Sequence, residues 1–244
     1  MLDTIKLKYY QGDKYIKDIQ NAPIKDSFRG FPIIKEGEID VSCCPLNALS
    51  TNPNKIDMGK CTFCAKCKSE IIQFSPKYKI SSASRENLII KENMTFEEFE
   101  KTAIKARKEI KKIFSKSLKL RQVSAGGCNG CEMELNACLN ANFDMGRFGI
   151  EFTASPRHAD GLVITGPITK NMAYALEDCY QSTPNPKIVI LAGACAISGG
   201  IFQNSDMLNR EFIEKYNIDL YIPGCPIHPL TFINALLDYL EIKA

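Results

Sequence analysis

The second half of the chain, from residue 118 onward, alternates short apolar runs with segments whose apolar residues recur at helical spacing. Buried strands of a parallel sheet read as nearly continuous apolar runs, and helices between them provide the crossovers. The predicted strands are 118–124, 149–155, 161–166, 187–194 and 219–224, and the predicted helices are 131–141, 171–180 and 228–240. This pattern predicts an α/β domain over residues 118–244, with a doubly wound parallel sheet of the flavodoxin-like type.

A helix over residues 94–117 is expected to connect this domain to residues 1–93. Thr95 and Glu98 have the spacing of a capping box, in which each side chain bonds the other residue's backbone N–H. Phe96, Phe99 and Ala103 then begin a helical repeat that continues to Ile110 and Phe114. No Gly/Ser/Pro-rich linker is present, so we expect the two domains to pack directly against each other.

Composition is that of a globular protein, with 45% hydrophobic and 24% charged residues and a mean hydropathy of -0.15. The longest apolar run, 188–197, falls well short of the roughly 20 residues that a spanning helix needs, so no membrane anchor is expected. The first residues resemble neither a secretory nor a twin-arginine signal, which predicts a cytoplasmic location. The net charge of +3 comes from basic and acidic residues spread along the chain and does not indicate a nucleic-acid partner.

Eleven cysteines are many for an intracellular protein, and in a reducing compartment they indicate metal binding more than disulfides. Cys61, Cys64 and Cys67 form a C-x-x-C-x-x-C array, and a Cys-Pro step precedes it at Cys44. Bacterial-type ferredoxins carry two such arrays, each followed by a Cys-Pro whose cysteine ligates the cluster of the other array. The same spacing places the ligands of a second cluster at Ile34, Gly37, Asp40 and Ile71, none of which is a cysteine.

The losses are therefore matched, because all four ligands of one cluster are missing and all four of the other remain. Residues 1–93 are accordingly predicted to be a degenerate ferredoxin-like α+β domain with one 4Fe-4S cluster held by Cys44, Cys61, Cys64 and Cys67. A zinc knuckle also uses C-x-x-C pairs and is the alternative, although a third cysteine at the same spacing is less typical of zinc. Cys43 is expected to be a buried spare thiol.

A second set of four cysteines follows three of the predicted strands of the α/β domain. Cys128 and Cys131 lie in GGCNGC, Cys195 in AGAC and Cys225 in PGCP. The carboxyl ends of parallel strands meet at one crevice, so these thiols are expected to form one metal site. The surrounding glycines would let backbone N–H groups approach a cluster, which favours iron-sulfur, but four thiolates also suit zinc. The glycine-rich AGACAISGG lacks the G-x-G-x-x-G order of a nucleotide site.

Several motifs of this domain, in the right order, resemble the small subunit of energy-converting group 4 nickel-iron hydrogenases, most closely the formate hydrogenlyase type. The motifs are GGCNGCEMEL, MGRFGIEFTASPRHADGLVITGPIT, GACAISGGIF and YIPGCP. The resemblance implies a proximal 4Fe-4S cluster on Cys128, Cys131, Cys195 and Cys225, and a partner large subunit with the nickel-iron site. With the first domain this gives two 4Fe-4S clusters, no catalytic residues, and peripheral attachment to the cytoplasmic side of the membrane through membrane subunits.

The same fold is shared with the 20 kDa subunit of complex I, which carries adjacent cysteines where Asn129 and Gly130 separate Cys128 from Cys131 here. This separation favours a hydrogenase over a quinone reductase, while a related sulfur reductase shares it. The first domain, with FRGFP, resembles the polyferredoxin-type subunit that is usually a separate partner. A quinone or sulfur reductase module and a zinc-stabilised scaffold protein remain alternatives.

Several other residues have two interpretations. Glu132 is a proton-relay or partner-contact candidate, or an acid favoured in a first helical turn. Arg157 and His158 could lie near the cluster or serve as a structural ion pair or cap. Thr165, Gly166 and Pro167 are expected to end a strand and line the crevice, His228 to cap a helix, and Cys138 and Cys179 to be core thiols.

Overall fold

The computed structural model describes residues 3, 5–6, 9, 15–103 and 117–242. Its larger domain is built on five parallel strands. These are β6 (Leu118–Ser124), β7 (Ile150–Phe152), β8 (Gly161–Thr165), β9 (Ile188–Ala192) and β10 (Leu220–Ile222). Their order in the sheet is β7-β6-β8-β9-β10, which is the doubly wound flavodoxin-like order and confirms the predicted fold class.

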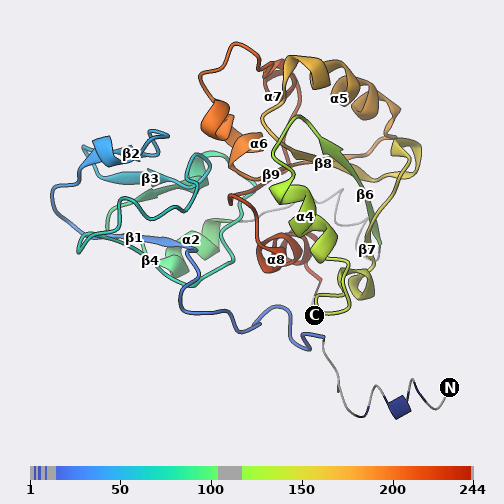
Figure 1. Cartoon of the computed structure of the whole chain (residues 1–244), viewed down its shortest axis with the longest axis horizontal. Coiled ribbons are helices and arrows are strands. Elements are labelled where there is room, and N and C mark those ends of the chain that lie inside the picture. Colours follow the sequence, from blue (N-terminus) through green and yellow to red (C-terminus); the bar gives the residue numbers. More distant parts are fainter. Residues whose placement is uncertain (1–2, 4, 7–8, 10–14, 104–116, 243–244) are drawn as a thin grey trace.

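Helices cover both faces of this sheet (Figure 1), as the uninterrupted burial of β8 and β9 requires. On one face, α4 and α8 pack over Leu120, Val163 and Ile190. On the other face, α5, α6 and α7 pack over Val123 and Ile164. The bounds are α4 (Gly130–Ala137), α5 (Lys170–Ser182), α6 (Ala194–Ser198), α7 (Glu211–Lys215) and α8 (Pro229–Leu240), with single turns η3 (Met145–Phe148), η4 (Pro156–His158) and η5 (Gly200–Phe202).

The N-terminal domain contains two small antiparallel sheets. One pairs β1 (Pro32–Ile34) with β4 (Ile72–Phe74), and the other orders β2 (Leu49–Ser50), β3 (Lys55–Asp57) and β5 (Ile89–Lys91). Two single turns, η1 (Val41–Cys43) and η2 (Glu86–Leu88), complete it. The α-helix that packs on these sheets is α2 (Phe96–Ala103), which begins just beyond residue 93 and brings Phe99 against Phe31.

The helix expected from residue 94 begins as α2 (Phe96–Ala103). Its capping box is confirmed, because Glu98 Oε2 accepts from Thr95 N–H at 2.9 Å and Thr95 Oγ1 accepts from Glu98 N–H at 3.2 Å. Phe99 is fully buried, and its ring lies 5.4 Å from that of Phe31. The remainder of the predicted helix, residues 104–116, lies outside the described residues.

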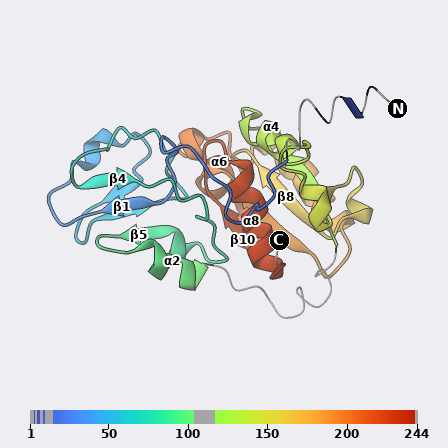
Figure 2. The same ribbon diagram turned by 90° about the horizontal axis from the view of Figure 1, so that it is seen from below.

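The two domains pack directly against each other, as the missing linker predicts (Figure 2). Apolar residues of both, such as Met58 and Ile197, belong to one core. A short main-chain bridge also joins them, with Ser82 N–H donating to Tyr221 O at 3.0 Å and Tyr221 N–H to Ser82 O at 2.8 Å. The contact between the domains is thus held by burial and by backbone hydrogen bonds.

The segment that precedes β1 lies along the larger domain. Ile19 is fully buried in the core around α8, and Asn234 of that helix donates through Nδ2 to Ile19 O at 3.0 Å. Arg147 Nη2 donates to Ile16 O at 2.5 Å. These contacts attach the segment before β1 to the larger domain.

Candidate functional site

The first cysteine set lies in the loop between β3 and β4. Cys61, Cys64 and Cys67 line one cavity together with Cys44, which ends the turn η1. Phe63 and Ala65, between these cysteines, have left-handed φ values of 52° and 61°. Left-handed residues at such turns direct neighbouring N–H groups to one side of the loop, an arrangement that recurs at iron-sulfur sites. The structure thus brings the four predicted ligands together around a curved loop.

Hydrogen bonds and burial act in opposite directions on these thiols. Phe63 N–H donates to Cys61 Sγ at 3.2 Å, and Ala48 N–H donates to Cys44 Sγ at 3.4 Å. Burial, assisted by the neighbouring thiols, raises the pKa of Cys61 to about 12 and that of Cys67 to about 11. Four thiolates here would need a cationic group between them, so the donor set fits an iron-sulfur cluster whose charge offsets the burial.

The positions of the missing second cluster also meet in space, but they are filled by apolar packing. Ile34 of β1 pairs with Ile72 of β4, and both are 2% exposed. Lys35 N–H donates to Ile71 O at 2.9 Å, and a Cβ atom on Gly37 would lie 2.6 Å from Ile71 Cδ1. Three of the four substituted positions thus converge, as two halves of a ferredoxin-like domain would require.

The second cysteine set stands at the carboxyl edge of the parallel sheet. Cys128 and Cys131 occupy the turn from β6 into α4, Cys195 begins α6 after β9, and Cys225 follows β10. A Cβ atom on Gly130 would lie 3.5 Å from both Cys128 Sγ and Pro226 Cβ, and one on Gly193 would lie 2.6 Å from Cys131 Sγ and 3.6 Å from Gly224 O, so the segments that carry the four thiols lie side by side. The structure therefore brings the four predicted thiols to one crevice.

Two glycines lie so close to cysteine sulfurs of this set that a side chain at either position would collide with the sulfur. A Cβ atom on Gly193 would lie 2.6 Å from Cys131 Sγ, and one on Gly200 would lie 2.7 Å from Cys195 Sγ. Both glycines have positive φ, so any other residue would be strained as well as crowded. The glycines of AGACAISGG therefore shape a cysteine site, in keeping with the absence of a nucleotide-binding order.

Burial and backbone hydrogen bonds shift the pKa values of the second cysteine set in the same directions as those of the first. Burial raises the pKa of Cys131 to about 12, and it also raises the pKa values of Cys195 and Cys225. The N–H of Ile227 bonds Cys131 and that of Ile201 bonds Cys195, and each lowers the pKa of its thiol. Converging thiols, inward N–H donors and glycine-lined space fit a 4Fe-4S cluster.

Arg210 is a residue of this site that the sequence did not reveal. Its guanidinium donates to four carbonyls, with Nη1 to Pro167 O (3.0 Å) and Cys195 O (3.2 Å), and Nη2 to Ala196 O (2.8 Å) and Ile197 O (2.9 Å). Burial lowers its pKa to about 10, which leaves it charged at neutral pH, next to Cys195. It stabilises the end of α6, because short helices leave such carbonyls without partners. No sequence motif marks this role.

Glu132 is buried, with 6% of its surface exposed, in the first turn of α4. Its Oε1 accepts from Ser124 Oγ at 2.6 Å and from Thr165 Oγ1 at 2.7 Å. The carboxylate therefore joins the ends of β6 and β8 to the helix that carries Cys131. Its position agrees with the first-turn interpretation, and Thr165 ends β8 as expected.

The other residues with two interpretations lie away from the thiols or have structural contacts. Arg157 and His158 form η4, which precedes β8, so they stand at the edge of the sheet opposite the cysteines and are not near the second set. His228 caps α8, with Nδ1 accepting from Leu230 N–H at 3.2 Å, as predicted.

Three cysteines remain outside the two sets. Cys138 is a core thiol as predicted. Cys179, also predicted to be a core thiol, is instead half-buried and packs against the core from its margin. Cys43 is also half-buried, which corrects its prediction as a buried thiol, because its turn η1 lies at the edge of the domain with Sγ 2.9 Å from Asp40 O.

Two negative observations apply to the described part of the chain. Within residues 15–103 and 117–242, no three Cys, His, Asp or Glu side chains are close enough to hold a single metal ion. Among the helices that the structure describes, none has the length and apolarity to cross a membrane.

Known proteins resemble mainly the larger domain. A sequence model of the family "NADH ubiquinone oxidoreductase, 20 Kd subunit" matches residues 128–239. A probable membrane-bound hydrogenase subunit of Pyrococcus furiosus is 40% identical over 119 residues, which are 49% of this chain and 71% of the relative. Formate hydrogenlyase subunit 7 of Escherichia coli is 46% identical over 137 residues, 55% of this chain and 53% of the relative.

Among solved structures, a chain of an archaeal membrane-bound sulfane sulfur reductase is 30% identical with a TM-score of 0.47. The match covers 55% of this chain and 74% of that one. The relatives named here are thus subunits of hydrogenase, formate hydrogenlyase and sulfur reductase complexes. With 71% of a 40%-identical relative covered, this chain belongs to the family of the 20 kDa subunit of NADH ubiquinone oxidoreductase, which is an oxidoreductase family.

Proposed function

We propose that this chain is an electron-transfer subunit with two 4Fe-4S clusters in a membrane-associated, complex I-like nickel-iron hydrogenase. The observation that carries the proposal is the presence of two separate four-cysteine sets. The first set lies in a curved loop and the second lies among glycines, and in each set backbone N–H groups bond cysteine sulfur. One set would lie toward the large subunit that holds nickel-iron, and the other would lie in the ferredoxin-like domain.

When bound, each 4Fe-4S cluster would accept and release single electrons. The chain's own residues determine how the clusters are held. Cys44, Cys61, Cys64 and Cys67 would ligate the first cluster, and Cys128, Cys131, Cys195 and Cys225 the second. The N–H groups of Phe63 and Ile227 stabilise negative charge on sulfur, which raises the reduction potential of a nearby cluster. In this proposal the described residues hold the clusters, and bond chemistry would take place in the large subunit.

The turn between β6 and α4 favours a hydrogenase over a quinone reductase. Asn129 has a left-handed φ of 67°, and Gly130 has Cys128 Sγ 3.5 Å from the position of a Cβ atom. This two-residue separation lets Cys128 and Cys131 enter the crevice from different points of the turn. The related complex I subunit, with adjacent cysteines, would need a different turn.

The partners would be a nickel-iron large subunit, a polyferredoxin-type iron-sulfur subunit and membrane subunits, on the cytoplasmic side of the membrane. Support comes from the two relatives named as subunits of membrane-bound complexes. A quinone or sulfur reductase complex is the second candidate, because the family's own description is that of a quinone reductase. The cysteines of the co-purified large subunit would separate these candidates.

The test is Cys195→Ser in the assembled complex, with Cys179→Ser as the control. We expect Cys195→Ser to lose one cluster signal, about four irons per chain, and to abolish hydrogenase activity. Cys179 lies on α5 outside both sets, so its replacement should preserve iron and activity. Full hydrogenase activity in Cys195→Ser would refute the proximal-cluster assignment.

A further inference from the structure

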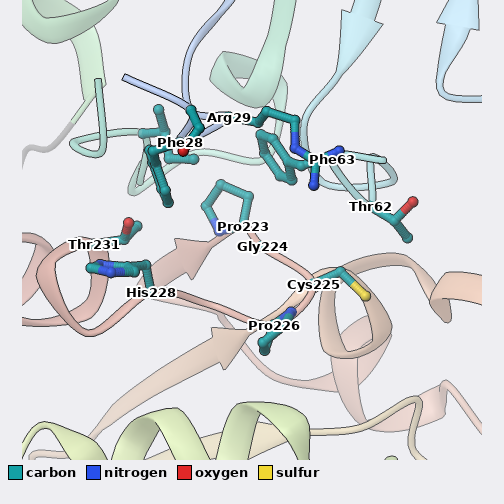
Figure 3. Close-up of a pocket in the computed structure, with 12 residues that line it drawn as sticks. Phe28, Arg29, Thr62, Phe63, Pro223, Gly224, Cys225, Pro226, His228 and Thr231 are labelled. Carbon is teal, nitrogen blue, oxygen red and sulfur yellow. The ribbon is translucent and has the colours of Figure 1, made fainter. Parts of the chain in front are cut away.

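A cavity of about 210 Å³ lies between the two cysteine sets (Figure 3). Phe28, Arg29, Thr62 and Phe63 line it from the N-terminal domain, and Pro223, Gly224, Cys225 and Pro226 line it from the larger domain. Thr62 and Phe63 are the residues between the ligands Cys61 and Cys64. The cavity is thus bounded by the ligand loop of the first set on one side and that of the second set on the other.

Cys64 and Cys225 are the thiols of the two sets that approach each other here. Both are exposed, in contrast to Cys61, which is buried. Cys225 lines the cavity itself, and Cys64 directly follows Phe63, which lines the cavity from the N-terminal domain.

Arg29 holds the ligand loop on its side of this cavity. Its Nη1 donates to Cys64 O at 2.9 Å, a contact between residues far apart in sequence. Figure 3 shows Arg29 and Phe63 on one side of the cavity, with Pro223 and Cys225 facing them. Arg29 thus fixes the backbone of one ligand next to the opposing loop and places a positive charge in the lining of the cavity.

The rest of the domain boundary keeps this geometry fixed. Gln203, in the segment after Cys195, donates through Nε2 to Leu46 O, near Cys44, at 3.2 Å. A Cβ atom on Gly59 would lie 2.8 Å from Ile197 Cγ2, so the two ligand-bearing segments pack closely. The distance between the two sets is therefore set by packed structure and does not depend on a flexible hinge.

We infer that electrons pass directly between the two clusters within this chain, through the edges formed by Cys64 and Cys225, and that Arg29 is the positioning residue of this junction. The inference rests on the proposed function. In each transfer one electron would leave the cluster held by one set, which would be oxidised, and enter the cluster held by the other, which would be reduced. No bond is made and no proton moves. The ferredoxin-like domain is then in line with the electron route and is not a side branch.

The experiment uses the full chain, purified anaerobically, with iron and sulfide measured before spectroscopy. The sample is reduced with dithionite and examined by electron paramagnetic resonance. Because two reduced clusters at short range couple magnetically, we expect the wild-type signals to be split or broadened by each other. A wild-type sample with about eight irons and two independent spectra would overturn the inference but leave the proposed function intact. Fewer irons, or zinc, would contradict the proposed function and the inference together.

Two variants of Arg29 separate positioning from charge. Arg29→Gln loses both the charge and the forked donor, so we expect a weaker magnetic interaction and a lower potential for the first cluster. Arg29→Lys retains the charge, so the potential should stay near that of the wild type while the interaction weakens. Arg157→Gln, an exposed arginine at the opposite edge of the sheet, is the matched control and should change neither property. An Arg29→Gln protein with full iron and an unchanged interaction would refute the role of Arg29.

Discussion

At the level of single residues, two opposing effects set the protonation of the cysteine thiols. Burial alone favours the protonated form of Cys61 and Cys131, and backbone N–H groups partly oppose it. The cysteines themselves could be predicted from spacing, because ligand chemistry demands those residue types. Arg210 could not, since its role depends on carbonyls of α6 that come near it only in the fold.

At this scale Arg210→Leu should destabilise the protein. The change leaves carbonyls of α6 without their charged donor, which should lower the free energy of unfolding by roughly 3 kcal/mol. Arg210→Lys should recover part of this loss, because an ammonium can serve fewer of the carbonyls. Anaerobic denaturant titration measures both. A Leu variant as stable as the wild type would show that α6 does not need this residue.

Alkylation of the loaded protein tests the ligand assignment residue by residue. Of eleven cysteines, eight are assigned to clusters, which leaves Cys43, Cys138 and Cys179. Burial raises the pKa of all three thiols, but Cys138 is fully buried whereas Cys43 and Cys179 are half-buried, so iodoacetamide should modify Cys43 and Cys179 first. Mass spectrometry of digested protein gives the sites. Rapid labelling of any assigned ligand in iron-replete protein would remove it from its set.

Among the elements, the regular ones could be predicted from the sequence and the short ones could not. The predicted strand 118–124 appears as β6 with the same bounds, and the predicted helix 228–240 appears as α8 from residue 229. Both segments are long enough for the spacing of their apolar residues to repeat several times, which makes the pattern recognisable. By contrast, α6 and α7 have five residues each, too few for a period to emerge. Their stability comes from tertiary contacts.

The strand β1 provides a test of the lost second cluster. Ile34 is 2% exposed and stands where a ferredoxin ligand would be, so Ile34→Ala should cost about 2–5 kcal/mol without reducing iron. Ile33, on the opposite face of the same strand, is 40% exposed and makes a matched control whose alanine variant should change stability little. Denaturation midpoints and iron content measure both. Loss of iron in Ile34→Ala at intact fold would contradict an apolar substitute for the cluster.

For the whole molecule, the main result is the arrangement of two cysteine sets on either side of one packed domain boundary. Parallel-sheet topology predicted that the second set would converge, since its members follow β6, β9 and β10. The sequence also indicated that the domains would pack together. It did not indicate which loops would face each other, because the contacts of Arg29 and Gln203 join residues with no shared motif.

The central claim, two 4Fe-4S clusters on one chain, is tested most directly by metal analysis. The full chain would be purified anaerobically, and iron, acid-labile sulfide and zinc would be measured per polypeptide. Two 4Fe-4S clusters would give about eight irons, matching sulfide and no stoichiometric zinc. About four irons would mean that one cysteine set holds no cluster, and zinc without sulfide would contradict the electron-transfer function altogether.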